Sequence, residues 1–104
     1  MSGKIEAYLG FSIKSNKVVF GFDALCETTK RVSLVVVCPT VNPKVEQKLI
    51  TLCANKKWVM VKTNNVLGEL IHRDNCKVLA ILDKSLANAI LNSNEVNIIE
   101  KGVL

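Results

Sequence analysis

Two unbroken apolar runs constrain the fold of this chain most strongly: Leu34–Cys38 and Val78–Leu82. Each run has the length of a β-strand and falls far short of the roughly 20 residues that a membrane span needs. Apolar side chains at every position, rather than at every second position, indicate strands that are covered on both faces. We therefore expect a sheet with helices packed on each side.

Segments of helical periodicity separate these runs. Around Leu9, apolar side chains recur at spacings of three and four residues, which gives one apolar stripe. Asn42–Pro43 is typical of a helix start, with the Asn as cap and the Pro at the first helical position. Asp83 is placed to cap the last helix. The sequence predicts helices at about residues 4–15, 24–30, 43–55, 66–71 and 84–93, and strands at about 18–20, 33–38, 58–62 and 77–82.

This order, αβαβαβαβα, predicts an α/β fold in which a three-layer α/β/α sandwich surrounds a four-stranded mixed sheet. With 104 residues the chain is long enough for one core, so we expect a single domain over residues 1–104. Residues 94–104 carry alternating apolar side chains, among them Val96 and Ile98. This tail either adds an edge strand or stays loose.

Composition and charge bound the cellular context. Hydrophobic residues make up 49% of the chain and charged residues 22%, which is typical of a globular rather than a disordered protein. Met1–Lys4 is not followed by the apolar run of a signal peptide, which favours the cytoplasm. The net charge of +5 favours a polyanionic partner. The alternative is that this charge only keeps a small domain soluble.

The cysteines and titratable residues do not indicate catalysis. Cys26, Cys38, Cys53 and Cys76 form no C-x-x-C pair, and we interpret them as buried thiols. His72 lies four residues before Cys76, but no second pair completes a zinc site. The sequence has no phosphate-binding glycine loop of the P-loop or dinucleotide type and no nucleophile elbow. We therefore expect no enzyme activity, no metal and no cofactor.

A glycine turn joins a strand to a helix within Lys17–Cys26. Asp23 stands where we expect the N-cap of that helix. Gly21 would let backbone N–H groups and the positive helix end approach an anionic or hydrogen-bonding ligand. The alternative is purely structural, because ordinary α/β domains also change direction through a strand, a glycine and a helix.

Several motifs share their order and spacing with a known family. Leu9–Gly21 contains Leu-Gly, then a basic residue at Lys14, then Lys17 followed by apolar residues and Gly21. Val35–Val37 and Leu67–Gly68 follow, and then come Val78–Asp83 and Leu86–Ala87. Together, over about residues 4–92, they resemble the ribosomal protein L7Ae-like superfamily, which includes ribosomal protein L30e and small bacterial proteins that bind kink-turns.

This resemblance implies an RNA-binding protein that recognises kink-turns, which are sharply bent RNA motifs with tandem sheared G·A pairs. In such proteins the glycine opens a G-x-N-E-x-x-K pattern. Its Asn and Glu read guanine edges, and its Lys contacts the RNA nearby. Here Gly21 is kept, whereas Asp23, Ala24 and Glu27 stand at the Asn, Glu and Lys positions.

The resemblance and the neighbouring basic residues give a set of candidate RNA contacts. These are Lys14, Lys17, Gly21, Phe22, Asp23, Lys62, Gly68, Arg73 and Asn75. The lysines and the arginine would contact phosphates. Phe22 either stacks on a base or folds back onto the core. Gly68 marks either close packing or the close approach of a ligand.

Two functions remain open at this point. The first is an RNA-binding accessory protein of the bacterial ribosome or translation machinery, a monomer without a membrane partner, bound to structured RNA such as ribosomal RNA. The second is a protein-interaction module that kept the fold and lost kink-turn recognition, since fold does not fix function. The replaced Asn, Glu and Lys positions favour the second.

Overall fold

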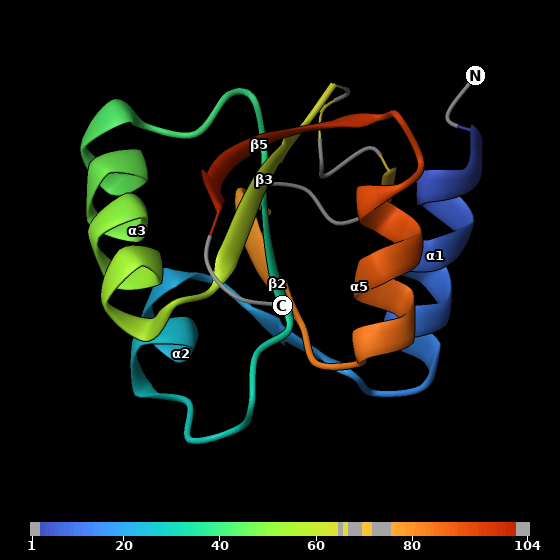
Figure 1. The fold of residues 1–104 in the computed structure, drawn as a ribbon, viewed down its shortest axis with the longest axis horizontal. Helices are drawn as coiled ribbons and strands as arrows, with labels where there is room; N and C mark the ends of the chain where they lie inside the picture. The colour runs from blue at the N-terminus through green and yellow to red at the C-terminus, as the bar shows by residue number, and fades with distance from the viewer. Residues whose placement is uncertain (1–2, 65, 67–69, 72–75, 102–104) are drawn as a thin grey trace.

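The computed structural model describes residues 3–64, 66, 70–71 and 76–101. A five-stranded sheet separates two layers of helices (Figure 1). The elements, in chain order, are α1 (Gly3–Lys14), β1 (Val18–Phe20), α2 (Phe22–Glu27), β2 (Leu34–Val37), α3 (Pro43–Lys56), β3 (Val59–Thr63), β4 (Val78–Ile81), α5 (Lys84–Leu91) and β5 (Val96–Lys101). Of the helix predicted over residues 66–71, residues 67–69 lie outside the described residues.

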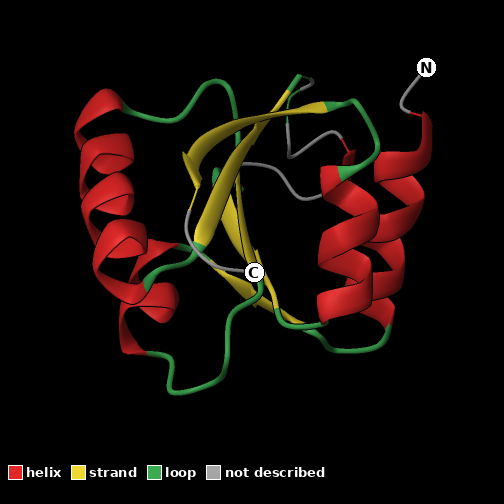
Figure 2. Cartoon of the chain, in the orientation of Figure 1, coloured by secondary structure: helices red, strands yellow, loops and turns green. Residues whose placement is uncertain are grey.

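The strand order in the sheet is β1-β4-β2-β3-β5. β2 and β3 run parallel, and the other three neighbouring pairs are antiparallel. Helices α1 and α5 cover one face, while α2 and α3 cover the other (Figure 2). The predicted α/β/α sandwich with a mixed sheet is therefore confirmed.

The predicted count of four strands is wrong. Residues Val96–Lys101 form β5, which pairs with β3 and makes a fifth strand at the edge of the sheet. Residues 96–101 of the tail therefore add an edge strand, which was one of the two predicted alternatives. Ile98 remains 55% exposed on β5, so the strand contributes only part of its apolar surface to the core.

Strands β2 and β4 form the centre of the molecule, and each of their residues is buried. Along β2 the side chains alternate between two core clusters. Leu34 and Val36 belong to the cluster beneath α1 and α5, whereas Val35 and Val37 belong to the cluster beneath α3. Coverage on both faces explains why the runs are unbroken in the sequence, as predicted.

The ends of the longer helices follow their predicted caps. The side chain of Asn42 accepts a hydrogen bond of 2.8 Å from the backbone N–H of Lys44, and Pro43 opens α3. The Asp83 carboxylate accepts a bond of 3.0 Å from the N–H of Leu86 in α5. These caps satisfy N–H groups that have no partner within the helix.

The prediction for α2 is wrong at both ends. The helix begins at Phe22, with Gly21 at the N-cap position, and ends at Glu27 instead of Lys30. Asp23 therefore lies in the first turn and is not the cap. Extended backbone at Thr28, with φ −67° and ψ 138°, ends the helix early.

The four cysteines differ in their exposure, and the prediction that all are buried is wrong for one of them. Cys38 and Cys53 are buried, Cys76 is half-buried, and Cys26 is exposed on α2. None of these four cysteines forms a disulfide. Burial, with a smaller contribution from the charge of Glu100, raises the pKa of the Cys53 thiol from 9.0 to about 12.

This difference predicts the order of thiol labelling. In the native protein at about pH 9, maleimide should modify Cys26 rapidly because it is exposed, and leave Cys53 unmodified because it is buried and its pKa is raised. Peptide mass spectrometry would give the rate at each site. In denaturant the two thiols should react at similar rates. Native labelling of Cys53 as fast as that of Cys26 would contradict the burial of α3 against the sheet.

Candidate nucleic-acid interface

Gly21 joins β1 to α2 in a backbone conformation that other residues rarely adopt. Its φ of 89° and ψ of 156° lie in a region populated almost only by glycine. The N–H of Gly21 donates to the carbonyl of Val78 at the start of β4 (3.0 Å), and its carbonyl accepts from Leu25 in α2 (3.1 Å). The glycine is therefore needed to leave the sheet and enter the helix within one residue.

The outer face of α2 carries carboxylates. Asp23, Ala24 and Glu27 are exposed, whereas Leu25 is buried. Phe22 is half-buried and packs against the core cluster beneath α3. This favours the interpretation that Phe22 folds back onto the core over the one in which it stacks on a base. The exposed positions that would read RNA in a kink-turn binder thus present two acidic groups and a methyl group.

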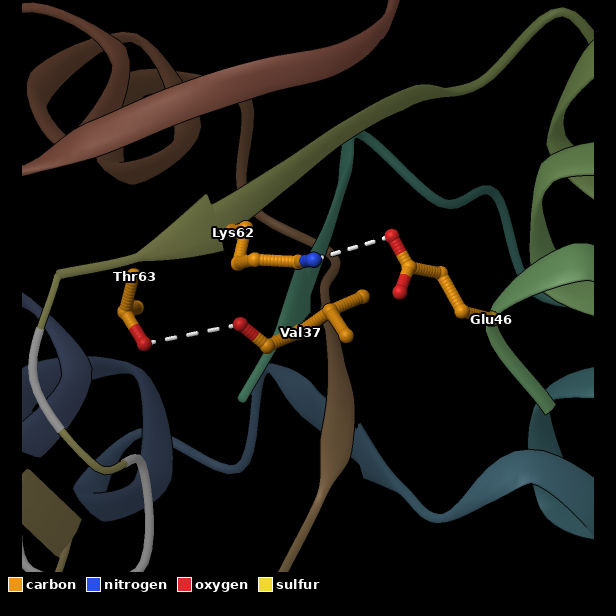
Figure 3. A network of polar contacts seen from close by, with 4 residues as sticks. All are labelled: Val37, Glu46, Lys62 and Thr63. Atoms are coloured by element: carbon orange, nitrogen blue, oxygen red, sulfur yellow. Dashed lines mark hydrogen bonds and ion pairs between the residues drawn. The ribbon is translucent and has the colours of Figure 1, made fainter. Parts of the chain in front are cut away.

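Lys62 and Thr63 lie at the end of β3, beside the end of β2 (Figure 3). Lys62 Nζ forms an ion pair of 2.9 Å with Glu46 of α3, and their side chains are 26% and 21% exposed. Thr63 Oγ1 donates to the carbonyl of Val37 at 3.4 Å. A phosphate bound by Lys62 would have to compete with the carboxylate of Glu46.

Backbone pairing places Gly21 and Lys62 at the same end of the sheet. Gly21 bonds to Val78, Val78 pairs with Val37, and Val37 pairs with Lys62. This row crosses four neighbouring strands, a distance of about 14 Å at the usual strand spacing. This end of the sheet therefore holds Gly21, Phe22, Asp23 and Lys62. We call it the glycine edge.

Lys77 also lies at the glycine edge and was missed by the sequence reasoning. It directly precedes β4, is exposed, and donates from Nζ to Thr40 Oγ1 at 2.8 Å. The sequence placed Lys77 inside the fourth strand, with no sign of which strand ends lie beside it. Only the pairing of β4 with β1 and β2 shows that Lys77 lies at this edge, and the sequence alone does not reveal that pairing.

Lys14 and Lys17 lie at the opposite end of the sheet. The carbonyl of Lys17 accepts a hydrogen bond of 2.9 Å from the N–H of Leu82, just beyond the end of β4. Gly21 is bonded instead to Val78, at the start of the same strand. The structure therefore divides the predicted RNA contacts between two edges. Gly68, Arg73 and Asn75 fall outside the described residues.

The described residues hold no group of three or more His, Cys, Asp or Glu side chains arranged to bind a metal ion. Among the helices that the structure describes, none is long and apolar enough to cross a membrane.

Comparison with known proteins assigns the family. The model of the ribosomal protein L7Ae/L30e/S12e/Gadd45 family matches residues 3–91. The chain belongs to this family. A solved structure of a protein of unknown function from Bacillus halodurans is similar, with a TM-score of 0.77 and 17% identity over 85% of this chain and 93% of the other. No curated protein matches the chain.

The conformation of Gly21 gives a prediction with an internal control. Replacing Gly21 with Ala should lower the free energy of unfolding by about 1–3 kcal/mol, because Ala is strained at a φ of 89° although no atom lies within 4 Å of the added Cβ. Replacing Gly10 with Ala should raise the free energy of unfolding by about 0.5–1 kcal/mol, because Gly10 is helical and equally unobstructed. Urea unfolding measures both.

The two substitutions add the same methyl group, so opposite signs would isolate the effect of backbone conformation. A Gly21→Ala variant as stable as the unchanged protein would show that the turn relaxes to an ordinary conformation.

Proposed function

We propose that this chain is an RNA-binding accessory protein of the ribosome or translation machinery, acting in the cytoplasm as a monomer and not as an enzyme. The observation that carries this proposal is the family match over residues 3–91, in a family named for ribosomal proteins. The net charge of +5 supports a polyanionic partner. The glycine that opens α2 supports an interface at the glycine edge.

The RNA recognised at this edge differs from a standard kink-turn. In the kink-turn binders that this chain resembles, Asn and Glu at the start of the corresponding helix read guanine edges. In this chain the two positions hold Asp23 and Ala24. A carboxylate accepts but does not donate hydrogen bonds, and Ala has no polar group. Because each good base contact contributes about 1–3 kcal/mol of discrimination, the protein binds kink-turns weakly.

The direct test is crosslinking in cells followed by sequencing of the bound RNA, with an electrophoretic mobility shift as its counterpart in vitro. We expect recovery of ribosomal or other structured RNA and an affinity that falls steeply with salt, since phosphate contacts release counterions. Absence of a shift at low salt with both ribosomal RNA and a kink-turn would overturn the proposal.

The acidic outer face of α2 favours one alternative, a protein-interaction module on the same fold. Asp23 and Glu27 are exposed there and would repel phosphate while attracting a basic protein surface. A stoichiometric protein partner that co-purifies after ribonuclease treatment would support this alternative. Loss of all partners on ribonuclease treatment would support RNA binding.

The replaced positions allow a gain-of-function test. The triple variant Asp23→Asn, Ala24→Glu, Glu27→Lys restores the G-x-N-E-x-x-K pattern on exposed positions of α2. We expect its affinity for a kink-turn RNA to rise at least about tenfold, the equivalent of one good base contact. Fluorescence anisotropy with a labelled kink-turn measures the change.

The single variant Glu27→Lys is the matched control, because it alters the net charge by the same amount as the triple variant. An equal gain in both would mean that charge alone is responsible and that α2 is not oriented to read bases. A mutant RNA without the tandem G·A pairs should remove the difference between the two variants.

A further inference from the structure

Three chain segments meet at the edge of the sheet opposite to the glycine edge. The N–H of Leu82 donates to the carbonyl of Lys17 (2.9 Å), and the N–H of Ser33 donates to the carbonyl of Ile81 (2.8 Å). The start of β1, the end of β4 and the start of β2 are therefore neighbours. In Figure 1 the end of α1, the start of α5 and the segment before β2 all lie along the lower side of the molecule.

This edge is strongly basic. The cations in its segments, residues 11–17, 30–34 and 81–84, are Lys14, Lys17, Lys30, Arg31 and Lys84, and all five are exposed. The same segments contain one acidic residue, Asp83, whose carboxylate already caps α5 through Leu86. No ion pair within the described part of the chain engages these five cations. We call this surface the basic edge.

An exposed aromatic ring lies beside the first of these cations, Lys14. Phe11 is 60% exposed in the last turn of α1, three residues before Lys14 and so on the same face of the helix. The opposite face of α1 carries Ile5, Leu9 and Ser12, which are buried. The ring of Phe11 therefore takes no part in the core, and its exposure is unexplained by the fold.

We propose that the basic edge is a second RNA-binding surface, which holds a single-stranded segment with one base stacked on Phe11 and its phosphates on the surrounding lysines and Arg31. An aromatic ring next to cations is the arrangement with which proteins bind single strands, because stacking uses the base and the cations use the backbone. The choice of RNA as the ligand rests on the proposed function. The surface itself is separate from the glycine edge.

The dimensions and the ring distinguish this ligand from others. From β1 across β4 to β2 the edge is about 10 Å wide, which lets cations from different segments contact successive phosphates. An acidic peptide would satisfy the same cations without using Phe11. The contribution of the ring therefore decides between a nucleic acid and an acidic protein.

The experiment measures binding of a labelled oligouridine by fluorescence anisotropy over a salt series. The basic-edge variant Lys14→Gln, Lys17→Gln, Lys84→Gln removes three exposed lysines, and Lys44→Gln, Lys48→Gln, Lys56→Gln removes three from the exposed face of α3 as the control. We expect an affinity loss of at least about tenfold and a salt slope lower by about 2 in the basic-edge variant only.

A second variant tests the stacking of a base. Phe11→Ala should lower the affinity for oligouridine about fivefold or more, whereas Phe11→Trp should preserve it, because both aromatic rings stack on bases. Since Phe11 is exposed, thermal unfolding of the Ala variant should match that of the unchanged protein. Equal affinity of Phe11→Ala and the unchanged protein would overturn the proposal and favour an acidic peptide.

The outcomes separate this inference from the proposed function. Equal losses in the basic-edge and α3 variants would overturn the inference, and the proposed function would stand if structured RNA still bound. Binding of oligouridine through the basic edge without any binding of structured RNA would support the inference and overturn the proposed function. Absence of binding to either RNA would overturn both.

Discussion

Strand β4 is hydrogen-bonded on both sides, to β1 and to β2, and both candidate surfaces depend on this pairing. Its start fixes Gly21 through the carbonyl of Val78, and the residue after its end fixes Lys17 through the N–H of Leu82. All residues of β4 are buried between two helix layers, so they cannot shift without opening both core clusters. The central pairing thus holds the two edges apart at fixed positions.

Local signals predicted most of the fold. Continuous apolar runs gave the buried strands, and the caps at Asn42 and Asp83 gave the starts of α3 and α5, because each signal needs only neighbours in the sequence. The grouping of candidate contacts could not be predicted in this way. Lys17 and Gly21 are four residues apart, yet extended backbone separates them by about 13 Å and places them at opposite ends of β4. Strand pairing between distant segments decides which cations meet, as Lys77 also illustrates.

At the start of α2, the sequence predicted Asp23 as the N-cap, and the structure has Gly21 in that position. Asp is a good N-cap residue, but the sharp turn at Gly21 begins the helix before Asp23 can take that position. The helix has only six residues and carries a carboxylate in its first turn, which offsets its positive end. The positive end of this helix therefore adds little to the attraction of an anion at the glycine edge.

The excess positive charge of the chain is unevenly distributed over the described residues. At the glycine edge, Lys62 is paired with Glu46, exposed Lys77 donates to Thr40, and Asp23 lies close to the turn. At the basic edge, five cations face solvent with one carboxylate that is already used as a cap. Carboxylates on α2 at one end, and exposed cations together with Phe11 at the other, have the same physical consequence for the RNA binding that we propose. RNA affinity would come from phosphates and stacking, which tolerate many sequences, and selectivity would then depend on the shape of the RNA.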